Sequence, residues 1–123
     1  MTGGLEHLPP SALRAGPSTP GMARSEAVST SGMWSGLVHT EAGASSGWHH
    51  HGSWESTIYV VSGVLRMEFA DGTFDASAGE FVYVPAGVVH RELNPTSATS
   101  EAVVVRATRV GGEAVVNVDG PPS

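Results

Sequence analysis

The chain has 123 residues, which suffices for one compact domain and is too few for two ordinary ones. Its net charge of −6 arises from 12 acidic residues against six arginines, so no nucleic-acid partner is expected. Without cysteine or lysine, the sequence offers no thiolate nucleophile, no disulfide, no cysteine-ligated metal and no side-chain Schiff base. No signal-peptide pattern and no apolar run of ~18 residues is visible, so a cytoplasmic protein without a membrane partner is expected.

Residues 1–25 are rich in proline and glycine, which predicts an extended N-terminal arm. From residue 26 onward, valine, tyrosine, phenylalanine and threonine alternate with turns that contain glycine or proline, a pattern typical of short strands. Strands are expected at residues 26–30, 33–40, 48–51, 57–61, 64–69, 73–76, 80–84, 89–93, 101–109 and 115–118. This spacing predicts one all-β domain over residues 26–119, a sandwich or barrel, followed by a tail at 120–123.

A run of three histidines lies in the expected strand 48–51. Because strand side chains alternate, His49 and His51 point to one face and His50 to the other. Farther along, a turn at 85–87 with proline and glycine fixes the direction of His90 at the start of another strand. Imidazole is a common ligand of borderline divalent metals, so His49, His51 and His90 are expected to bind one metal ion. Ligand type suits Fe, Mn, Ni, Co, Cu or Zn and does not select among them.

The expected fourth metal ligand is Glu55, which follows the histidine run. Strict alternation places Ser56, Ile58 and Val60 on one strand face and Glu55 on the other. Either a β-bulge brings Glu55 to the metal, or the site has three histidines with water in the remaining positions. Glu92 shares a face with His90, and Glu55 and Glu92 are the candidate catalytic bases.

A further set of residues is expected to line the substrate pocket. Several have a structural alternative. The aromatics could be core or rim residues, Arg66 could face outward, and the lone His39 could be a hydrogen-bonded structural residue. The expected pocket residues are Trp48, Trp54, Tyr59, Arg66, Phe81, Asn94 and His39.

Together the two histidine segments resemble the two motifs of the cupin family. The first motif, glycine, His-x-His, glutamate and glycine, is similar to the stretch 43–63 with His49, His51 and Glu55. Its match is imperfect, because seven residues instead of six separate Glu55 from Gly63. The second motif matches at its fixed positions, which are Gly79, Pro85, Gly87, His90 and Asn94.

This resemblance implies a cupin-type double-stranded β-helix, or jelly-roll barrel, that holds one divalent transition metal. It also implies a metal-dependent small-molecule enzyme, with dioxygenase-like chemistry on a chelating enol, phenol or diketone as the first expectation. The alternatives are a non-oxidative isomerase, lyase or cyclase, and a barrel that binds a small ligand without converting it. Similar small barrels with a long arm dimerise through exchanged terminal strands, so a homodimer is expected.

Overall fold

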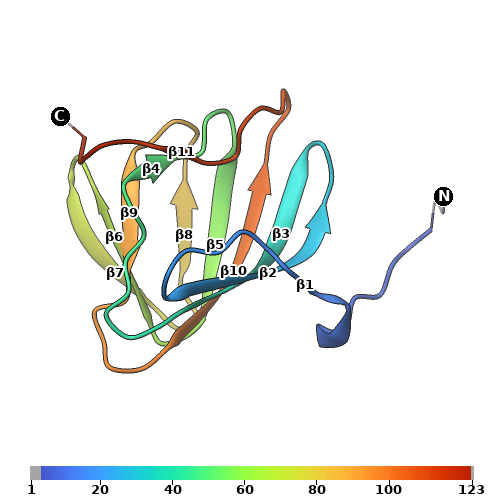
Figure 1. Cartoon of the computed structure of the whole chain (residues 1–123), viewed down its shortest axis with the longest axis horizontal. Helices are drawn as coiled ribbons and strands as arrows, with labels where there is room; N and C mark the ends of the chain where they lie inside the picture. Colours follow the sequence, from blue (N-terminus) through green and yellow to red (C-terminus); the bar gives the residue numbers. More distant parts are fainter. Residues whose placement is uncertain (1–3, 123) are drawn as a thin grey trace.

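Two antiparallel sheets face each other across the interior of the protein, as the computed structural model of residues 4–122 shows (Figure 1). The six-stranded sheet has the order β1 (Arg14–Ala15), β2 (Met22–Ser29), β3 (Met33–Thr40), β10 (Ser100–Ala107), β5 (Glu55–Ser62), β8 (Phe81–Val84). The five-stranded sheet has the order β11 (Val116–Asn117), β4 (His49–His50), β9 (His90–Leu93), β6 (Val64–Phe69), β7 (Gly72–Ser77). Each expected strand is present within a few residues of its expected bounds, and the predicted all-β barrel is confirmed.

The core lies between the two sheets and is built from alternate residues of their strands. On β5, Ser56, Ile58 and Val60 are buried while the residues between them are exposed. The alternation expected from the sequence therefore holds along this strand. Buried apolar side chains from both sheets complete the core, namely Met22, Val38, Leu65, Met67, Ala76, Val82, Val84, Ala102 and Val104.

The folded domain begins earlier than the sequence predicted. Met22 is only 1% exposed and pairs with Thr40, so β2 is an inner strand of the sheet and not part of an arm. The turn residues that suggested an arm connect β1 to β2, and Arg14 on β1 pairs with Glu26. The boundary expected at residue 25 is wrong, because proline and glycine there mark a turn between two paired strands.

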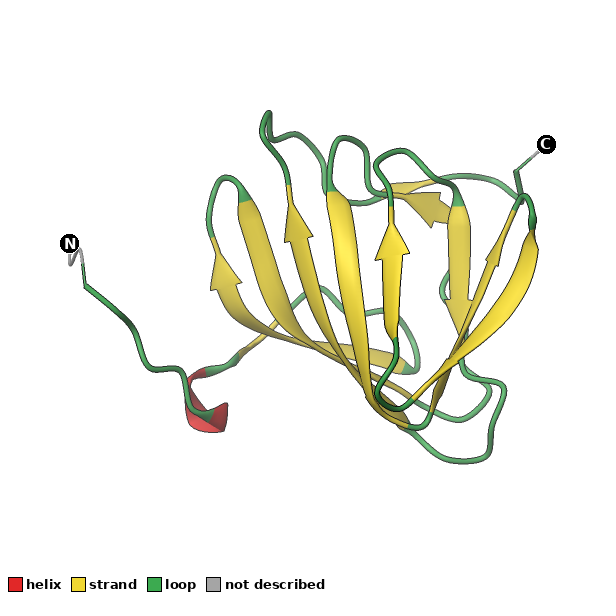
Figure 2. Ribbon diagram, turned by 180° about the vertical axis from the view of Figure 1, so that it is seen from behind, coloured by secondary structure: helices red, strands yellow, loops and turns green. Residues whose placement is uncertain are grey.

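Residues 4–13 extend away from both sheets and include a short 3-10 helix, η1 (Pro10–Ala12), none of whose residues is buried (Figure 2). No helix within residues 4–122 is long and apolar enough to cross a membrane.

Candidate metal centre

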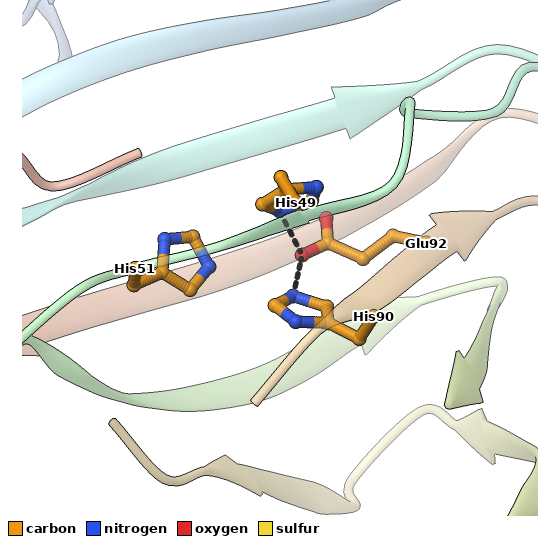
Figure 3. Close-up of side chains that lie close together, drawn as sticks. All are labelled: His49, His51, His90 and Glu92. Carbon is orange, nitrogen blue, oxygen red and sulfur yellow. Dashed lines mark hydrogen bonds and ion pairs between the residues drawn. The ribbon is translucent and has the colours of Figure 1, made fainter. Parts of the chain in front are cut away.

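Three histidines and one glutamate converge in the interior, on the inner face of the five-stranded sheet (Figure 3). His49 on β4 is the direct register partner of His90 on β9, which brings residues 41 positions apart side by side. His51 directly follows β4, and Glu92 lies two positions beyond His90, on the same strand face. All four residues are buried, and one potential donor atom from each lies within 4.8 Å of the others.

Each imidazole is oriented by a hydrogen bond from its own Nδ1. The acceptors are backbone carbonyl oxygens of Gly47 for His49 at 2.8 Å, of Ala114 for His51 at 2.7 Å and of Val88 for His90 at 2.9 Å. A carbonyl oxygen only accepts, so each Nδ1 carries a proton, and a ring that is neutral then presents an unprotonated Nε2. At His90, Nε2 shares a hydrogen bond of 3.3 Å with the Glu92 carboxylate. Such outer hydrogen bonds fix the tautomer of metal-binding histidines.

The spacing of the donor atoms fits a transition metal. Glu92 Oε1 lies 3.3 Å from His90 Nε2 and 3.9 Å from His49 Nε2. Ligand atoms about 2.0–2.1 Å from a tetrahedral metal are about 3.4 Å apart. Three imidazoles with one carboxylate also match the donor preference of borderline divalent ions. The group therefore has the donors and the spacing to hold the metal expected from the sequence.

The charges within the cluster favour neutral histidines at two positions. Burial lowers the pKa of His51 to about 3 and also lowers that of His49. Burial acts in the same direction on His90, but the hydrogen bond and negative charge of Glu92 outweigh it and raise the pKa of His90. Burial alone would raise the pKa of Glu92, whereas its hydrogen bond to His90 and the nearby positive charges hold it well below its usual value. Glu92 is thus an anion in the interior, next to three imidazoles.

Glu55 does not belong to this group, contrary to the expectation for the fourth ligand and for a catalytic base. It lies on the exposed outer face of β5, where the Tyr83 hydroxyl donates a hydrogen bond of 2.9 Å to its carboxylate. No bulge turns it inward, because β5 keeps its pairing with β8 and β10 from Glu55 to Tyr59. The carboxylate next to the imidazoles is Glu92, which strand alternation had placed on the inner face with His90.

Four of the expected pocket residues lie on outer faces of the sheets. Tyr59 and Phe81 pack against each other outside β5 and β8, with ring centroids 4.9 Å apart. Arg66 forms an ion pair of 2.7 Å with Asp75 across β6 and β7. His39 lies outside β3, with its Nε2 3.4 Å from a carboxylate oxygen of Glu101 on β10.

The other three expected pocket residues support loops. The half-buried Trp48 packs under the guanidinium of Arg91, 4.8 Å from its ring centre. Trp54 is buried, and its Nε1 donates to the Gly112 carbonyl oxygen at 3.1 Å. Asn94 is fully buried and donates to the carbonyl oxygens of Thr40 and Ala98, at 2.9 and 2.7 Å. Each has its polar atoms committed to the fold or its ring on the surface, and none of the three borders the cavities next to the donor cluster.

A different set of residues lines the space next to the donor cluster. A cavity of about 250 Å³ reaches His49 and is bordered by Arg24, Trp34 and Arg106. A small recess of about 10 Å³, bordered by the same three residues, continues to His51 and Glu92. Sequence reasoning missed all three residues, although the inward positions Ala102 and Val104 extend to Arg106 in the same alternation.

A second, larger cavity of about 520 Å³ is lined by residues of β6, β7 and β8 and of the turn before His90. Its lining is mostly apolar, and of the four donor residues it reaches only His90. Because His51, His49 and Glu92 face the smaller cavities, the side of the cluster with Arg24 and Arg106 is the polar side.

Comparison with known proteins agrees with this architecture. A family model described as Cupin domain matches residues 36–106, more than half of the chain. No curated protein matches the sequence significantly.

Solved structures with similar folds cover most of the chain. The polyketide cyclase RemF from Streptomyces resistomycificus has a TM-score of 0.76 at 20% identity, with 94% of this chain and 86% of that chain covered. KdgF from Halomonas sp. has a TM-score of 0.74 at 19% identity, covering 85% and 95%. A sugar phosphate isomerase from Silicibacter pomeroyi has a TM-score of 0.73 at 20% identity, covering 96% of both chains. At these identities the likeness shows the fold alone.

Proposed function

Because the chain belongs to the cupin family, we propose that it is a metal-dependent enzyme that acts on a small molecule at the site formed by His49, His51, His90 and Glu92. The observation that carries the proposal is the convergence of these four buried donors, with every Nδ1 bound to a backbone carbonyl oxygen. A cluster of imidazoles fixed in this way has its free nitrogens directed at one point, as a metal centre requires.

A bound divalent metal would polarise the oxygen atoms of a substrate that chelates it. The chain itself would bind and orient that substrate in the cavity next to Trp34 and exclude water from the narrow recess behind it. Glu92 is the only carboxylate that borders these two cavities within residues 4–122. Its Oε1 lies next to the imidazoles, so its other oxygen is the candidate to accept a substrate proton.

For the reaction class we favour non-oxidative chemistry, in which a proton moves or a bond forms without oxygen. Two of the similar folds belong to proteins named as a polyketide cyclase and a sugar phosphate isomerase, and this supports the choice. An ionised carboxylate next to the donor cluster is also in position to accept a proton from a bound substrate. Dioxygenase-like chemistry, the first expectation from the sequence, is the competing outcome in the tests below.

The metal centre is tested by elemental analysis and metal titration of protein purified without a histidine tag. One equivalent of a divalent transition metal is expected in the wild type. The His51→Ala variant should bind that metal at least about tenfold more weakly, because it loses one of four ligands. The control is His50→Ala, which removes a neighbouring imidazole that accepts a hydrogen bond from the Gly52 N–H and lies outside the cluster. Equal affinities for the two variants would contradict the metal site.

The reaction class is tested with metal-loaded protein and a panel of hydroxy ketones, diketones and phenols. Product formation without oxygen uptake would support the non-oxidative proposal, and stoichiometric oxygen uptake would replace it with dioxygenase chemistry. Saturable binding across the panel without turnover of any member would instead favour a barrel that only binds its ligand.

A further inference from the structure

Two of the six arginines border both cavities on the polar side of the donor cluster. Arg24 comes from β2 and Arg106 from β10, and β3 lies between these two strands in the sheet. On β2, Arg24 shares its face with the core residue Met22, and on β10, Arg106 shares its face with Val104. Both guanidinium groups therefore belong to the lining of the barrel interior.

Neither of these two arginines has a carboxylate bound to it within the described part of the chain. The guanidinium of Arg24 donates only to the Pro17 carbonyl oxygen, at 3.4 Å, and the buried Nε of Arg106 has no hydrogen-bond partner. Three of the other arginines do have such partners, as the pairs Arg14–Glu26, Arg66–Asp75 and Arg91–Glu68 show, each with a hydrogen bond of 2.7 Å. A buried donor without a partner is unfavourable, so the Nε of Arg106 is available to a ligand, and Arg24 adds a second positive charge to the lining of the same cavity.

The surroundings of Arg106 hold it in place without neutralising it. Its guanidinium lies over the ring of Trp34, 5.1 Å from the ring centre. The indole Nε1 in turn donates to Glu26 at 2.8 Å, which fixes the ring. Gly36 leaves room for this arrangement, because a Cβ there would lie 2.8 Å from the Trp34 ring and 2.2 Å from the Ser25 carbonyl oxygen. Burial lowers the pKa of Arg106, although a guanidinium keeps its charge at any pH near neutrality.

We propose that Arg24 and Arg106 form an anion-binding subsite that recognises the carboxylate of a small substrate. The inference rests on the proposed function, because the same substrate would reach the metal centre with its other oxygen atoms. A planar guanidinium presents paired N–H donors that match the two oxygens of a carboxylate. The cavity of about 250 Å³ is close to the lower end of small-molecule sites, which favours a compact acid over a large phosphorylated ligand.

The charge around the cavity supports the same ligand class. No carboxylate of residues 4–122 borders the cavity of about 250 Å³, and Glu92, which borders the adjoining recess, has its oxygen engaged by the imidazoles. A divalent metal at the centre would balance the negative charge of Glu92. The positive charges of the two guanidinium groups would then be left for an anionic ligand to balance. A neutral ligand of the same shape would leave both guanidinium groups unpaired.

The test is calorimetric titration with malonate and its neutral diamide, malonamide, on metal-free and zinc-loaded protein at low ionic strength. Malonate is expected to bind both forms, and malonamide at least tenfold more weakly. Arg106→Met and Arg24→Gln should each weaken malonate binding at least tenfold in both forms. The matched control is Arg109→Met, which removes the same charge from an exposed position outside the cavity and should change the affinity less than twofold.

Several results would overturn the subsite. They are no malonate binding to the wild type, equal binding of malonamide, an equal loss in Arg109→Met, or tighter binding of inorganic phosphate than of malonate. If Arg106→Met fails to fold, Arg106→Lys keeps the charge without the paired donors, and it should still bind malonate several-fold more weakly. Metal stoichiometry is measured on the same samples. Malonate binding that depends on Arg106 in a protein without metal affinity would contradict the enzyme proposal and leave the anion subsite standing.

Discussion

Three hydrogen bonds, one donated by each imidazole ring, set the geometry of the metal centre. Each Nδ1 donates to a carbonyl oxygen of a different segment, at Gly47, Val88 and Ala114. Two of these acceptors precede their histidine by two positions, so the local backbone turn itself orients the ring. The rings lie 4.4–5.1 Å apart between centroids, close enough to share one ion.

The first prediction at this scale concerns which carboxylate completes the centre. Glu92→Gln removes the charge next to His90 and His49 while keeping the shape of the side chain. We expect metal affinity to fall at least about tenfold, because an amide oxygen is a weaker ligand than a carboxylate. Glu55→Gln is the matched control, since Glu55 is exposed and bonded to Tyr83, and its affinity should equal that of the wild type. If metal affinity fell in Glu55→Gln and not in Glu92→Gln, Glu55 would be the fourth ligand, as the sequence predicted.

The second prediction is the pH dependence of stability in the metal-free protein. The pKa of His51 falls from 6.5 to about 3 on folding, so between these values the unfolded chain binds a proton that the folded one does not. Stability should therefore decrease as pH falls from 6.5 toward 4.5, by up to about 1.4 kcal/mol per pH unit from this residue. His49 acts in the same direction, whereas the raised pKa of His90 stabilises the folded chain, and this contribution is fully present once the pH is well below 6.5.

The measurement for this prediction is urea unfolding at several pH values. His51→Asn keeps a donor for the Ala114 carbonyl oxygen and removes the titrating group, so its stability should depend less steeply on pH. The His39→Asn variant changes an exposed-face histidine and should keep the wild-type slope. Identical slopes in all three proteins would show that burial of His51 does not control the pH response.

Strand alternation explains why the histidines could be predicted from the sequence while the carboxylate was misassigned. His49, His51 and His90 follow from the period of two and from the turn before His90. The same period placed Glu55 outside and Glu92 inside, and the structure follows it on β5 and β9. The family motif pointed to Glu55 instead, so here local backbone geometry was the better guide.

At the scale of elements, the segment 110–118 closes the metal centre from the end of the chain. β11 pairs with β4 through Val116↔His50 and Asn117↔His49, so it covers the strand that carries His49. The Ala114 carbonyl oxygen accepts from His51, and the Gly112 carbonyl oxygen accepts from Trp54. The expected strand at 115–118 was correct, but the bonds of this segment to the site could not be read from a sequence pattern, because they use backbone atoms.

The third prediction follows from these contacts. A chain that ends at residue 109 loses β11 and the acceptor for His51, and its metal affinity should fall about 10–100-fold. The matched control ends at residue 119, keeps β11 and should bind metal as the full chain does. Near-UV circular dichroism establishes that both chains are folded. Equal affinities for these two folded chains would show that the segment does not support the centre.

β2 illustrates the limit of composition as a guide to element boundaries. Its first residues follow Pro20 and Gly21, which favour a turn, and the strand carries charged side chains at Arg24 and Glu26. Polar residues that face inward serve the interior cavity, and a hydrophobic pattern does not reveal them. Arg106, at the end of β10, was missed for the same reason, because it is a charged residue that faces inward. The two arginines missed by sequence reasoning thus break the apolar pattern of the barrel interior.

At the scale of the whole molecule, the metal centre borders cavities of different character. The apolar cavity reaches His90, and the cavity with two arginines reaches His49 and His51 through its recess. The outer surface has a further apolar feature, because Tyr59, Phe81 and Tyr83 are 37–70% exposed on β5 and β8. Exposed apolar side chains grouped in this way are typical of association surfaces.

The N-terminal arm extends away from the sheets, and two of its leucines are exposed, Leu5 at 106% and Leu8 at 36% of the reference surface (Figure 2). On an extended segment, such side chains gain apolar burial only when the arm packs on another surface. An arm-mediated homodimer therefore stays the prediction for the assembly.

The fourth prediction tests this assembly by light scattering coupled to gel filtration. The full chain should be a dimer, and a chain that begins at Leu13 should be a monomer, because it keeps the β1–β2 pairing but loses the projecting arm. The Phe81→Glu variant is the comparison, since it introduces a charge on the exposed outer face of β8 and leaves the arm intact. It should remain dimeric if the arm makes the interface. A truncated chain that stays dimeric, together with a monomeric Phe81→Glu variant, would contradict the arm-mediated dimer and place the interface on the outer face of β5 and β8.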